Sequence, residues 1–270
     1  MHTMSTHRGE DLIVTRSHGG ELTEIVFNRP HRHNAFTAVM YEQLTSVFEE
    51  LAADRAARVV LLRGAGALAF AAGNDIAEFA DMTEGAQAVA YERRVRSMLT
   101  TLADLPQVTI AAIDGLCVGG GLAVATYCDL RVATSSSRFG YPIARTLGNA
   151  LSRPLLERCV HIFGESTTRQ MLLASRLCDA RRAYELGVLL TVCESRTELD
   201  RELDDLVEGI LHAAPITVRT TKEQLRRISA SQEDPVLDET LLEAAYGSEA
   251  FREGVRAFLA KERPDFRSLP

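Results

Sequence analysis

The chain has 270 residues, of which 46% are apolar and 25% are charged, with 18 glycines and 8 prolines. This composition excludes a disordered or collagen-like chain, and the length suits one large domain that buries a sizeable core. The formal net charge of −7 argues against a broad nucleic-acid surface, because such a surface needs a basic stripe. Five scattered cysteines without CxxC spacing predict no disulfide framework and fit a reducing compartment.

Neither a targeting segment nor a membrane span is expected. The first ten residues lack the basic-then-apolar pattern of a signal peptide, so we expect a cytoplasmic protein. Only residues 108–128 are apolar enough to resemble a span, but they contain Asp114 and four glycines. This pattern predicts a buried strand, a glycine loop and a helix, and no membrane partner.

Apolar periodicity predicts strands that alternate with helices over the first 195 residues. The first strand, Leu22–Phe27, ends at the turn signal Asn-Arg-Pro, and Thr37 opens a helix. The elements that follow are a buried strand at 59–63, a helix at 85–104, a strand at Val108–Ile113, a helix at 121–128 and a strand at 130–133.

Beyond residue 166 the pattern is mostly helical. We expect helices at 167–174 and 179–186, a last strand at 188–193, and amphipathic helices at 198–213, 215–230 and 239–260. The predicted architecture is therefore α/β, with a core at 1–195 and a helical C-terminal region at 196–270.

Two glycine-bearing junctions, at 71–75 (AAGND) and 119–122 (GGGL), are the most informative feature. Small residues there let a ligand approach backbone N–H groups, and a helix starting at Gly121 would leave its first donors unpaired. Two convergent N–H groups, one from each loop, would hold an oxygen that becomes negative during a reaction. Either loop alone is better explained as a tight turn or a close-packing device, and neither has the spacing of a Rossmann or Walker loop.

The chain resembles the enoyl-CoA hydratase/isomerase (crotonase) family over nearly its whole length. The matching stretches occur in the family's order, at 28–35, 59–79, 110–133, 139–142 (FGYP), 183–190 and 258–266. The resemblance implies a crotonase-like spiral of β-β-α turns with a C-terminal α-helical trimerisation region. It also implies a homotrimer or a dimer of trimers.

The same resemblance implies an acyl-CoA thioester whose carbonyl oxygen lies between two backbone N–H groups. Coenzyme A is then part of the substrate, and no tightly bound cofactor is expected. Carried over by position, the donors are Asn74, whose side chain is expected to be incidental, and Gly120. The family's Lys after the GxD aspartate is Ala77 here, so phosphate contacts are expected from arginines or from the tail. The implied acyl-CoA-binding residues, besides the two donors, are Arg29, Arg32, Ala35, Ala71, Gly73, Asp75, Ile76, Gly119, Pro142, Ile143 and Lys261.

The sequence departs from the family's hydratases at their two acid/base glutamates. Those glutamates flank a water and act as general base and general acid. The matching positions here are Ala123 and Ile143, and no Asp or Glu occurs between residues 130 and 156. We therefore expect a divergent reaction (hydrolysis, decarboxylation, isomerisation or lyase cleavage), and a non-catalytic acyl-CoA-binding or scaffold protein is the alternative.

Polar side chains near the substituted positions are the remaining catalytic candidates. Tyr141 could donate a hydrogen bond, and Arg145 could act as an electrophile or a carboxylate anchor. Asp75 is expected to cap the helix that follows it, and Asp129 to close a helix-to-strand turn. The His31-Arg32-His33 pair lacks a third ligand, so no metal is expected, and Ser135–Ser137 lack the nucleophile-elbow motif.

Overall fold

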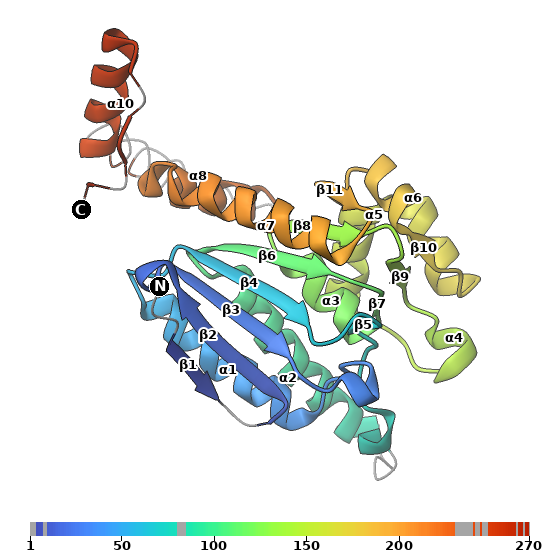
Figure 1. The fold of residues 1–270 in the computed structure, drawn as a ribbon. Helices are drawn as coiled ribbons and strands as arrows, with labels where there is room; N and C mark the ends of the chain where they lie inside the picture. The colour runs from blue at the N-terminus through green and yellow to red at the C-terminus, as the bar shows by residue number, and fades with distance from the viewer. Residues whose placement is uncertain are drawn as a thin grey trace.

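The protein is described by a computed structural model that covers residues 4–7, 10–79, 85–229, 240, 244, 248–262, 264–266 and 268–269. Two β-sheets lie at its centre, with helices around them (Figure 1). The larger sheet is antiparallel across its first three strands and parallel from the third onward. Its order is β1 (Met4–His7), β2 (Leu12–Ser17), β3 (Leu22–Phe27), β4 (Val59–Gly64), β6 (Val108–Ile113), β8 (Leu130–Thr134) and β11 (Thr191–Cys193).

The smaller sheet is built from short strands, three of which follow strands of the larger sheet. Its order is β10 (Cys178–Asp179), β9 (Arg138–Gly140), β7 (Leu116–Val118) and β5 (Ala69–Ala71). The neighbours β5, β7 and β9 are parallel to one another, so their carboxyl ends lie at the same edge. The pairs β4-β5 and β6-β7 each lead into a helix, which gives the repeating β-β-α turn. This arrangement brings the two glycine-bearing loops, which follow β5 and β7, side by side.

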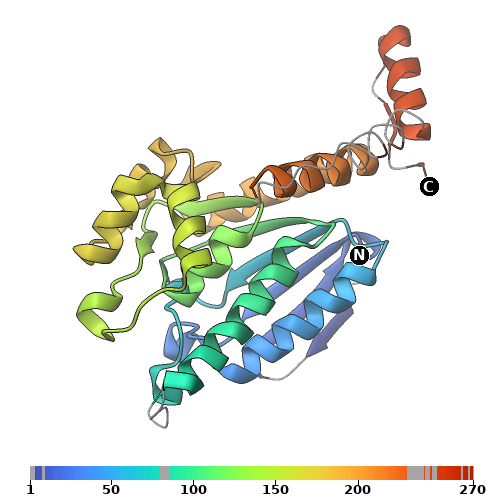
Figure 2. The same ribbon diagram turned by 180° about the vertical axis from the view of Figure 1, so that it is seen from behind.

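Helices α1 (Ala38–Ala53) and α2 (Gly85–Ala103) lie side by side on one face of the larger sheet (Figure 2). Thr37 caps α1, because its hydroxyl accepts a 3.2 Å hydrogen bond from the Met40 amide. The opposite face of the sheet is covered by α7 (Arg196–Leu211). Its buried side chains recur every four residues, at Leu199, Leu203, Val207 and Leu211. The first helix of the predicted C-terminal region thus packs directly on the core sheet.

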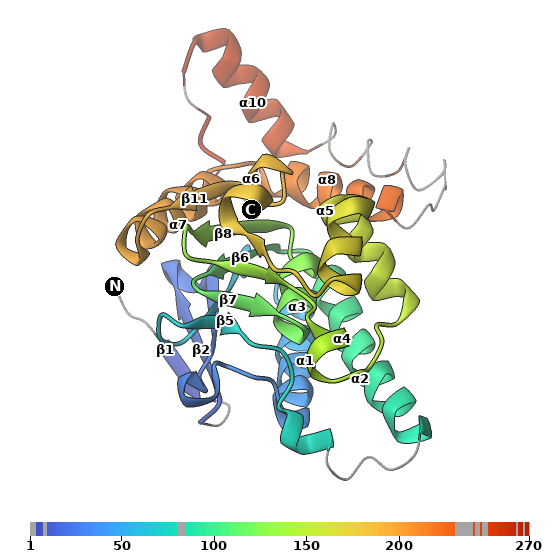
Figure 3. The ribbon, with the colours of Figure 1, turned by 90° about the vertical axis from the view of Figure 1, so that its right-hand side faces the viewer.

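The remaining helices surround the smaller sheet or extend beyond the larger one. Lys222, on α8, donates 2.6 Å hydrogen bonds to the Asp129 carboxylate and the Gln107 carbonyl, which ties α8 to the sheets. By contrast, α10 stands away from both sheets (Figures 1 and 3). Within the described ranges no helix is both long and apolar enough to cross a membrane. The helices other than α1, α2 and α7 are α3 (Gly120–Tyr127), α4 (Ile143–Thr146), α5 (Arg153–Leu173), α6 (Ala180–Glu185), α8 (Pro215–Ser229) and α10 (Glu249–Ala260). Three 3-10 turns are also present among the described residues: η1 (His18–Gly20), η2 (Pro30–Arg32) and η3 (Ile76–Phe79).

The long periodic elements agree with the sequence analysis, whereas several short or interrupted ones differ. The strands predicted at 22–27, 59–63, 108–113 and 130–133 are confirmed in β3, β4, β6 and β8. Helix α3 begins one residue earlier than predicted. Helix α5 begins at Arg153, whereas the prediction began at 167; the helix is kinked at Gly164 (φ 74°), and this glycine interrupts the apolar periodicity on which the prediction relied. The last strand is shorter than predicted, and the helix predicted at 239–260 lies partly outside the described residues.

Candidate active site

The two glycine loops pack against each other through their backbones. A Cβ atom placed on Gly73 would lie 3.7 Å from the Gly120 nitrogen, and one placed on Gly119 would lie 3.2 Å from the Gly73 Cα. Gly73 (φ 93°) and Gly119 (φ 55°) both adopt the left-handed region that favours glycine. The AAGND and GGGL segments, which are far apart in the sequence, therefore lie against each other.

Both predicted donor amides are free of backbone partners among the described residues. A bridge between Phe36 and Asn74 uses the Gly73 carbonyl and the Asp75 amide, at 2.8 Å and 2.7 Å. Because N–H groups alternate along an extended chain, the Asn74 amide points away from Phe36. Gly120 is the first residue of α3, where a helix leaves its N–H groups unpaired and carries a partial positive charge.

The start of α3 packs closely against the end of β5. A Cβ atom on Gly121 would lie 2.8 Å from the Ala71 Cβ and closer still to the Ala71 carbonyl. Gly121 and Ala71 are both fully buried or nearly so. Small residues at these two positions allow the helix terminus to approach the first loop, which fixes the spacing of the two amides.

The side chain of Asn74, which was expected to be incidental, makes a hydrogen bond that the sequence analysis did not foresee. Its Oδ1 accepts a 2.6 Å hydrogen bond from the Tyr41 hydroxyl. Both atoms lie 2.7 Å from the position that a Gly120 Cβ would occupy. The Tyr41–Asn74 pair therefore lies directly against the second donor residue. Tyr41 is 4% exposed, and burial raises the pKa of its hydroxyl, so it stays protonated and donates.

The segment 29–35 supports the first loop from the other side. Arg29 donates hydrogen bonds to the Ala35 carbonyl (2.7 Å) and the Asp75 carboxylate (2.9 Å). The Arg29 guanidinium lowers the pKa of Asp75, whose Oδ1 also accepts from the Ala77 amide at 3.2 Å, as a cap would. Arg29 is thus engaged within the protein, whereas Arg32 is exposed near Asp75. Of these two arginines, Arg32 is better placed to meet a phosphate group.

A third segment, which follows β9, lies next to the glycine triplet. The Gly119 amide donates a 3.0 Å hydrogen bond to the Gly140 carbonyl, which precedes Tyr141. Tyr141 is 1% exposed, and burial raises its pKa. Ala123 and Ile143, the positions where the resemblance places the glutamates of hydratases, are buried and half-buried. The Arg145 side chain is exposed on α4 and therefore does not lie in the buried part of the site.

Other candidates from the sequence lie elsewhere. Lys261 follows α10 and is not brought to the loops by its own chain (Figure 3). Asp129 joins Thr109 to Lys222, with distances of 2.8 Å and 2.6 Å, so it has a structural role. Ile76 is exposed beside the first loop. Among the described residues no group of three or more His, Cys, Asp or Glu side chains converges as a metal site requires.

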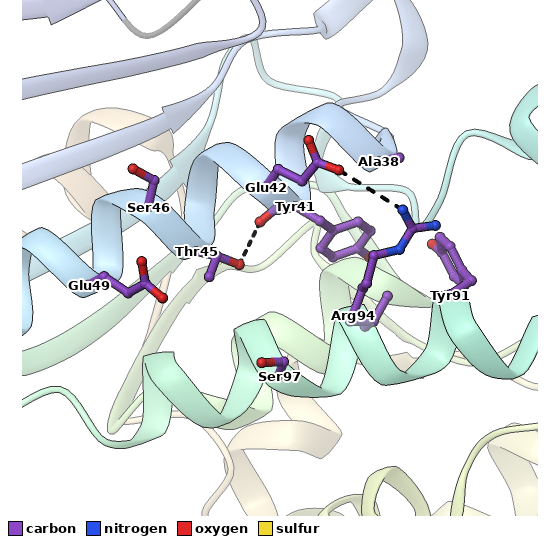
Figure 4. Close-up of a pocket in the computed structure, with 10 residues that line it drawn as sticks. Ala38, Tyr41, Glu42, Thr45, Ser46, Glu49, Tyr91, Arg94 and Ser97 are labelled. Atoms are coloured by element: carbon purple, nitrogen blue, oxygen red, sulfur yellow. Dashed lines mark hydrogen bonds and ion pairs between the residues drawn. The ribbon is translucent and has the colours of Figure 1, made fainter.

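Two tyrosines lie behind the Asn74 loop, and of these the sequence analysis did not foresee Tyr41. Tyr41 on α1 and Tyr91 on α2 pack edge to face, with ring centroids 6.1 Å apart. Both also line a cavity of about 300 Å³ between the two helices, across which Arg94 and Glu42 approach to 4.0 Å (Figure 4). Tyr41 therefore spans from this cavity to Asn74. The only signal in the sequence was the buried helical spacing of Tyr41, which is equally typical of a core residue.

Glu92, the residue after Tyr91, was also missed. It is half-buried on α2, and its Oε2 atom is buried without a hydrogen-bond partner among the described residues. Burial raises the pKa of this carboxyl group. The sequence analysis searched for acids only near the glycine triplet and the FGYP segment, whereas the fold brings α2 against α3.

The enoyl-CoA hydratase/isomerase family model matches residues 18–269. The chain belongs to this family. Human enoyl-CoA hydratase domain-containing protein 2, mitochondrial, is 34% identical over 76% of the chain and 71% of the relative. Mouse methylglutaconyl-CoA hydratase, mitochondrial, is 29% identical over 89% of the chain and 77% of the relative.

A solved structure of an enoyl-CoA hydratase/carnithine racemase from Magnetospirillum magneticum superposes with a TM-score of 0.87. It is 33% identical, and the match covers 97% of this chain and 96% of the other. The expected family and the mixed α/β, crotonase-like fold are therefore confirmed. The family match, expected from six short stretches, covers residues 18–269.

Proposed function

We propose that this family member is an enzyme that binds an acyl-CoA thioester and stabilises its enolate between the amides of Asn74 and Gly120. One observation carries the proposal: two amides without backbone partners among the described residues come from loops so close that a Cβ atom on Gly119 would lie 3.2 Å from the Gly73 Cα. Donors fixed in this way stabilise developing negative charge without reorganising, and one such donor contributes about 3–4 kcal/mol to transition-state stabilisation. Coenzyme A enters only as part of the substrate.

The reaction is of the lyase or isomerase type and is not the hydration of crotonyl-CoA. Hydration needs a base and an acid on either side of a water, and Ala123 and Ile143 can supply neither. The relatives named above as hydratases support the acyl-CoA class of substrate but do not define the acyl group. Tyr141 is the polar side chain next to the substituted position, with its hydroxyl held protonated by burial.

Ligand binding and assembly follow the family pattern in this proposal. Arg32 is the arginine available for a phosphate of coenzyme A. Exposed apolar side chains on α8 and α10 favour a homotrimer or a dimer of trimers. Because α10 stands away from both sheets (Figures 1 and 3), Lys261 would reach a ligand only in another copy of the chain. These side chains are Leu225, Ile228, Phe251 and Val255.

A chromophoric thioester, 4-(dimethylamino)cinnamoyl-CoA, tests the proposed pair of donors. Hydrogen bonds to its carbonyl oxygen draw electrons toward that oxygen and shift its absorption to longer wavelength. We expect a red shift on binding that Gly120→Pro abolishes, because proline has no N–H and is tolerated at the first position of a helix.

The matched control is Gly120→Ala, which introduces a Cβ at the same position beside Asn74 and Tyr41 but keeps the N–H. It should retain part of the shift. Binding without any red shift in the wild-type protein would contradict the proposal. Binding with a red shift but no turnover on a panel of acyl-CoA esters would favour the non-catalytic alternative.

A further inference from the structure

The two family positions that usually carry the acid and base hold apolar residues, so a proton-transfer group must come from another element. Ala123 is 2% exposed within α3, and Ile143 packs against the core. Around the site, Asp75 is paired with Arg29, and Glu78 caps α1 through a 2.7 Å hydrogen bond from the Ala38 amide. Both of these carboxylates have structural partners.

Glu92 differs from these two acids because one of its carboxylate oxygens is buried and unpartnered among the described residues. The Ser152 hydroxyl lies close enough to this carboxyl group to lower its pKa, but it too is buried and forms no well-aligned hydrogen bond among the described residues. A buried carboxylate oxygen without a hydrogen-bond partner is costly, so packing alone gives no reason for a glutamate at this position. A ligand that enters the site would supply the missing partner.

The neighbours of Glu92 place it between the two halves of the site. Its charge acts on Tyr41, which hydrogen-bonds to Asn74 and contacts Gly120. Its charge also acts on Tyr141, which directly precedes the Pro142–Ile143 segment. Helix α2, which carries Glu92, also packs against α3, the helix that begins at Gly120. Glu92 therefore lies within electrostatic reach of both tyrosines, on a helix that borders the glycine triplet.

The positive side chains of α2 leave Glu92 without an ion pair. With 3.6 residues per turn, Arg94 faces nearly the opposite side of the helix, where it approaches Glu42 across the cavity between α1 and α2 (Figure 4). Arg96, four residues after Glu92, lowers its pKa but forms no ion pair with it in the described part of the chain. Burial outweighs this effect and raises the pKa, which brings a carboxylate closer to the range useful for a general base.

We propose that Glu92 is the catalytic base and acid of this site, the carboxyl group that removes and returns a proton on the acyl group. This inference rests on the proposed function. The Glu92 carboxylate takes a proton from the carbon next to the thioester carbonyl. The electron pair of that C–H bond moves to the carbonyl oxygen, and the resulting enolate is held by the Asn74 and Gly120 amides.

The neutral Glu92 then returns the proton, either to the same carbon or, in a 3-enoyl thioester, to the γ carbon. In the second case the double bond moves to the 2,3 position and the thioester carbonyl is restored. No water, oxidant or second substrate is consumed. The substrate class is therefore an acyl-CoA with an acidic C–H beside the carbonyl, and a 3-enoyl-CoA gives a net isomerisation.

Exchange of the α-protons of butyryl-CoA in D₂O, followed by mass spectrometry, tests the step with a substrate that cannot isomerise. The wild-type protein should incorporate deuterium, and Glu92→Gln should lower the rate by about 100-fold or more. Glu92→Asp, which keeps a carboxylate on a shorter chain, should recover part of the rate. Glu165→Gln, an exposed acid on α5 that pairs with Arg169, is the matched control and should exchange at the wild-type rate.

The red shift of the chromophoric thioester separates the two proposals. If Glu92→Gln retains the red shift and loses exchange, both proposals stand. If Glu92→Gln exchanges at the wild-type rate, or if the wild-type protein shows the red shift but no exchange, Glu92 is not the proton-transfer group and the oxyanion site remains. If the wild-type protein shows no red shift, the proposed function itself is wrong.

Discussion

The Tyr41 hydroxyl donates a 2.6 Å hydrogen bond to Oδ1 of Asn74, and both atoms lie against Gly120. This contact links helix α1 to the loop that carries one proposed donor amide and borders the residue that carries the other. The Asn74 backbone pairs with Phe36, and the Tyr41 contact, which is made to the Asn74 side chain itself, is a further constraint on the direction of the Asn74 amide. Tyr41 is thus a positioning residue in this account.

Tyr41→Phe should lower kcat by about fivefold to tenfold with little change in KM, since one neutral hydrogen bond contributes about 1 kcal/mol. The effect should disappear when Asn74 is already alanine, because the two side chains act through one contact. Steady-state kinetics of the two single variants and the double variant test this coupling. Additive losses would show that Tyr41 acts independently of Asn74.

The pH dependence should report the ionisation of Glu92. A general base must be deprotonated, so kcat/KM should fall as the pH decreases through the Glu92 pKa and level off above it. Because burial raises this pKa, the acid limb should lie at higher pH than for an exposed glutamate. The groups that face Glu92 are Tyr41, Tyr91, Tyr141, Ser152 and Arg96, and the raised tyrosine pKa values keep those hydroxyls neutral in this range.

A profile with the acid limb of an ordinary exposed carboxylate would contradict this assignment. The fall of kcat/KM at low pH should also be absent from the residual activity of Glu92→Gln. A limb that persists unchanged in that variant would belong to another group.

Glu92→Gln should not destabilise the protein at neutral pH, and its Tm should equal or exceed that of the wild type. The folded-state pKa of Glu92 lies above the unfolded value, so the ionised carboxylate opposes folding once the pH exceeds the unfolded pKa. The wild-type Tm should therefore drop relative to the variant as the pH rises through the two pKa values. Thermal unfolding across this pH range measures the difference. A lower Tm for the variant at neutral pH would indicate a structural role for the carboxylate.

Gly121→Ala should destabilise the protein by about 1–3 kcal/mol, because the added methyl group meets the Ala71 backbone and cannot be accommodated without a shift. The matched control is Gly209→Ala in α7, where an added Cβ meets no atom within 4 Å. The control should increase stability by about 0.5–1 kcal/mol, since alanine favours a helix over glycine. Urea denaturation compares the two. Equal effects would show that the α3–β5 contact is not tight.

The sequence predicted the long elements well because β3, β4, β6 and α1 carry their own periodicity. It missed β5, β7 and β9, since three residues are too few to show an alternation. The two glycine loops were recognisable from the residues, because glycine at a loop followed by a helix has a specific backbone meaning, whereas the proposed donor positions within them came from the family resemblance. Tyr41 and Glu92 were not, because their role depends on which helix the spiral places behind each loop.

A crystal structure of the protein with a non-reactive acyl-CoA analogue tests the central claim most directly. The account predicts that the thioester carbonyl oxygen, or its stand-in, lies about 2.7–3.1 Å from the amide nitrogens of both Asn74 and Gly120. The Glu92 carboxylate should face the carbon next to that carbonyl. An analogue bound with its carbonyl oxygen outside hydrogen-bond reach of these two amides would contradict the account.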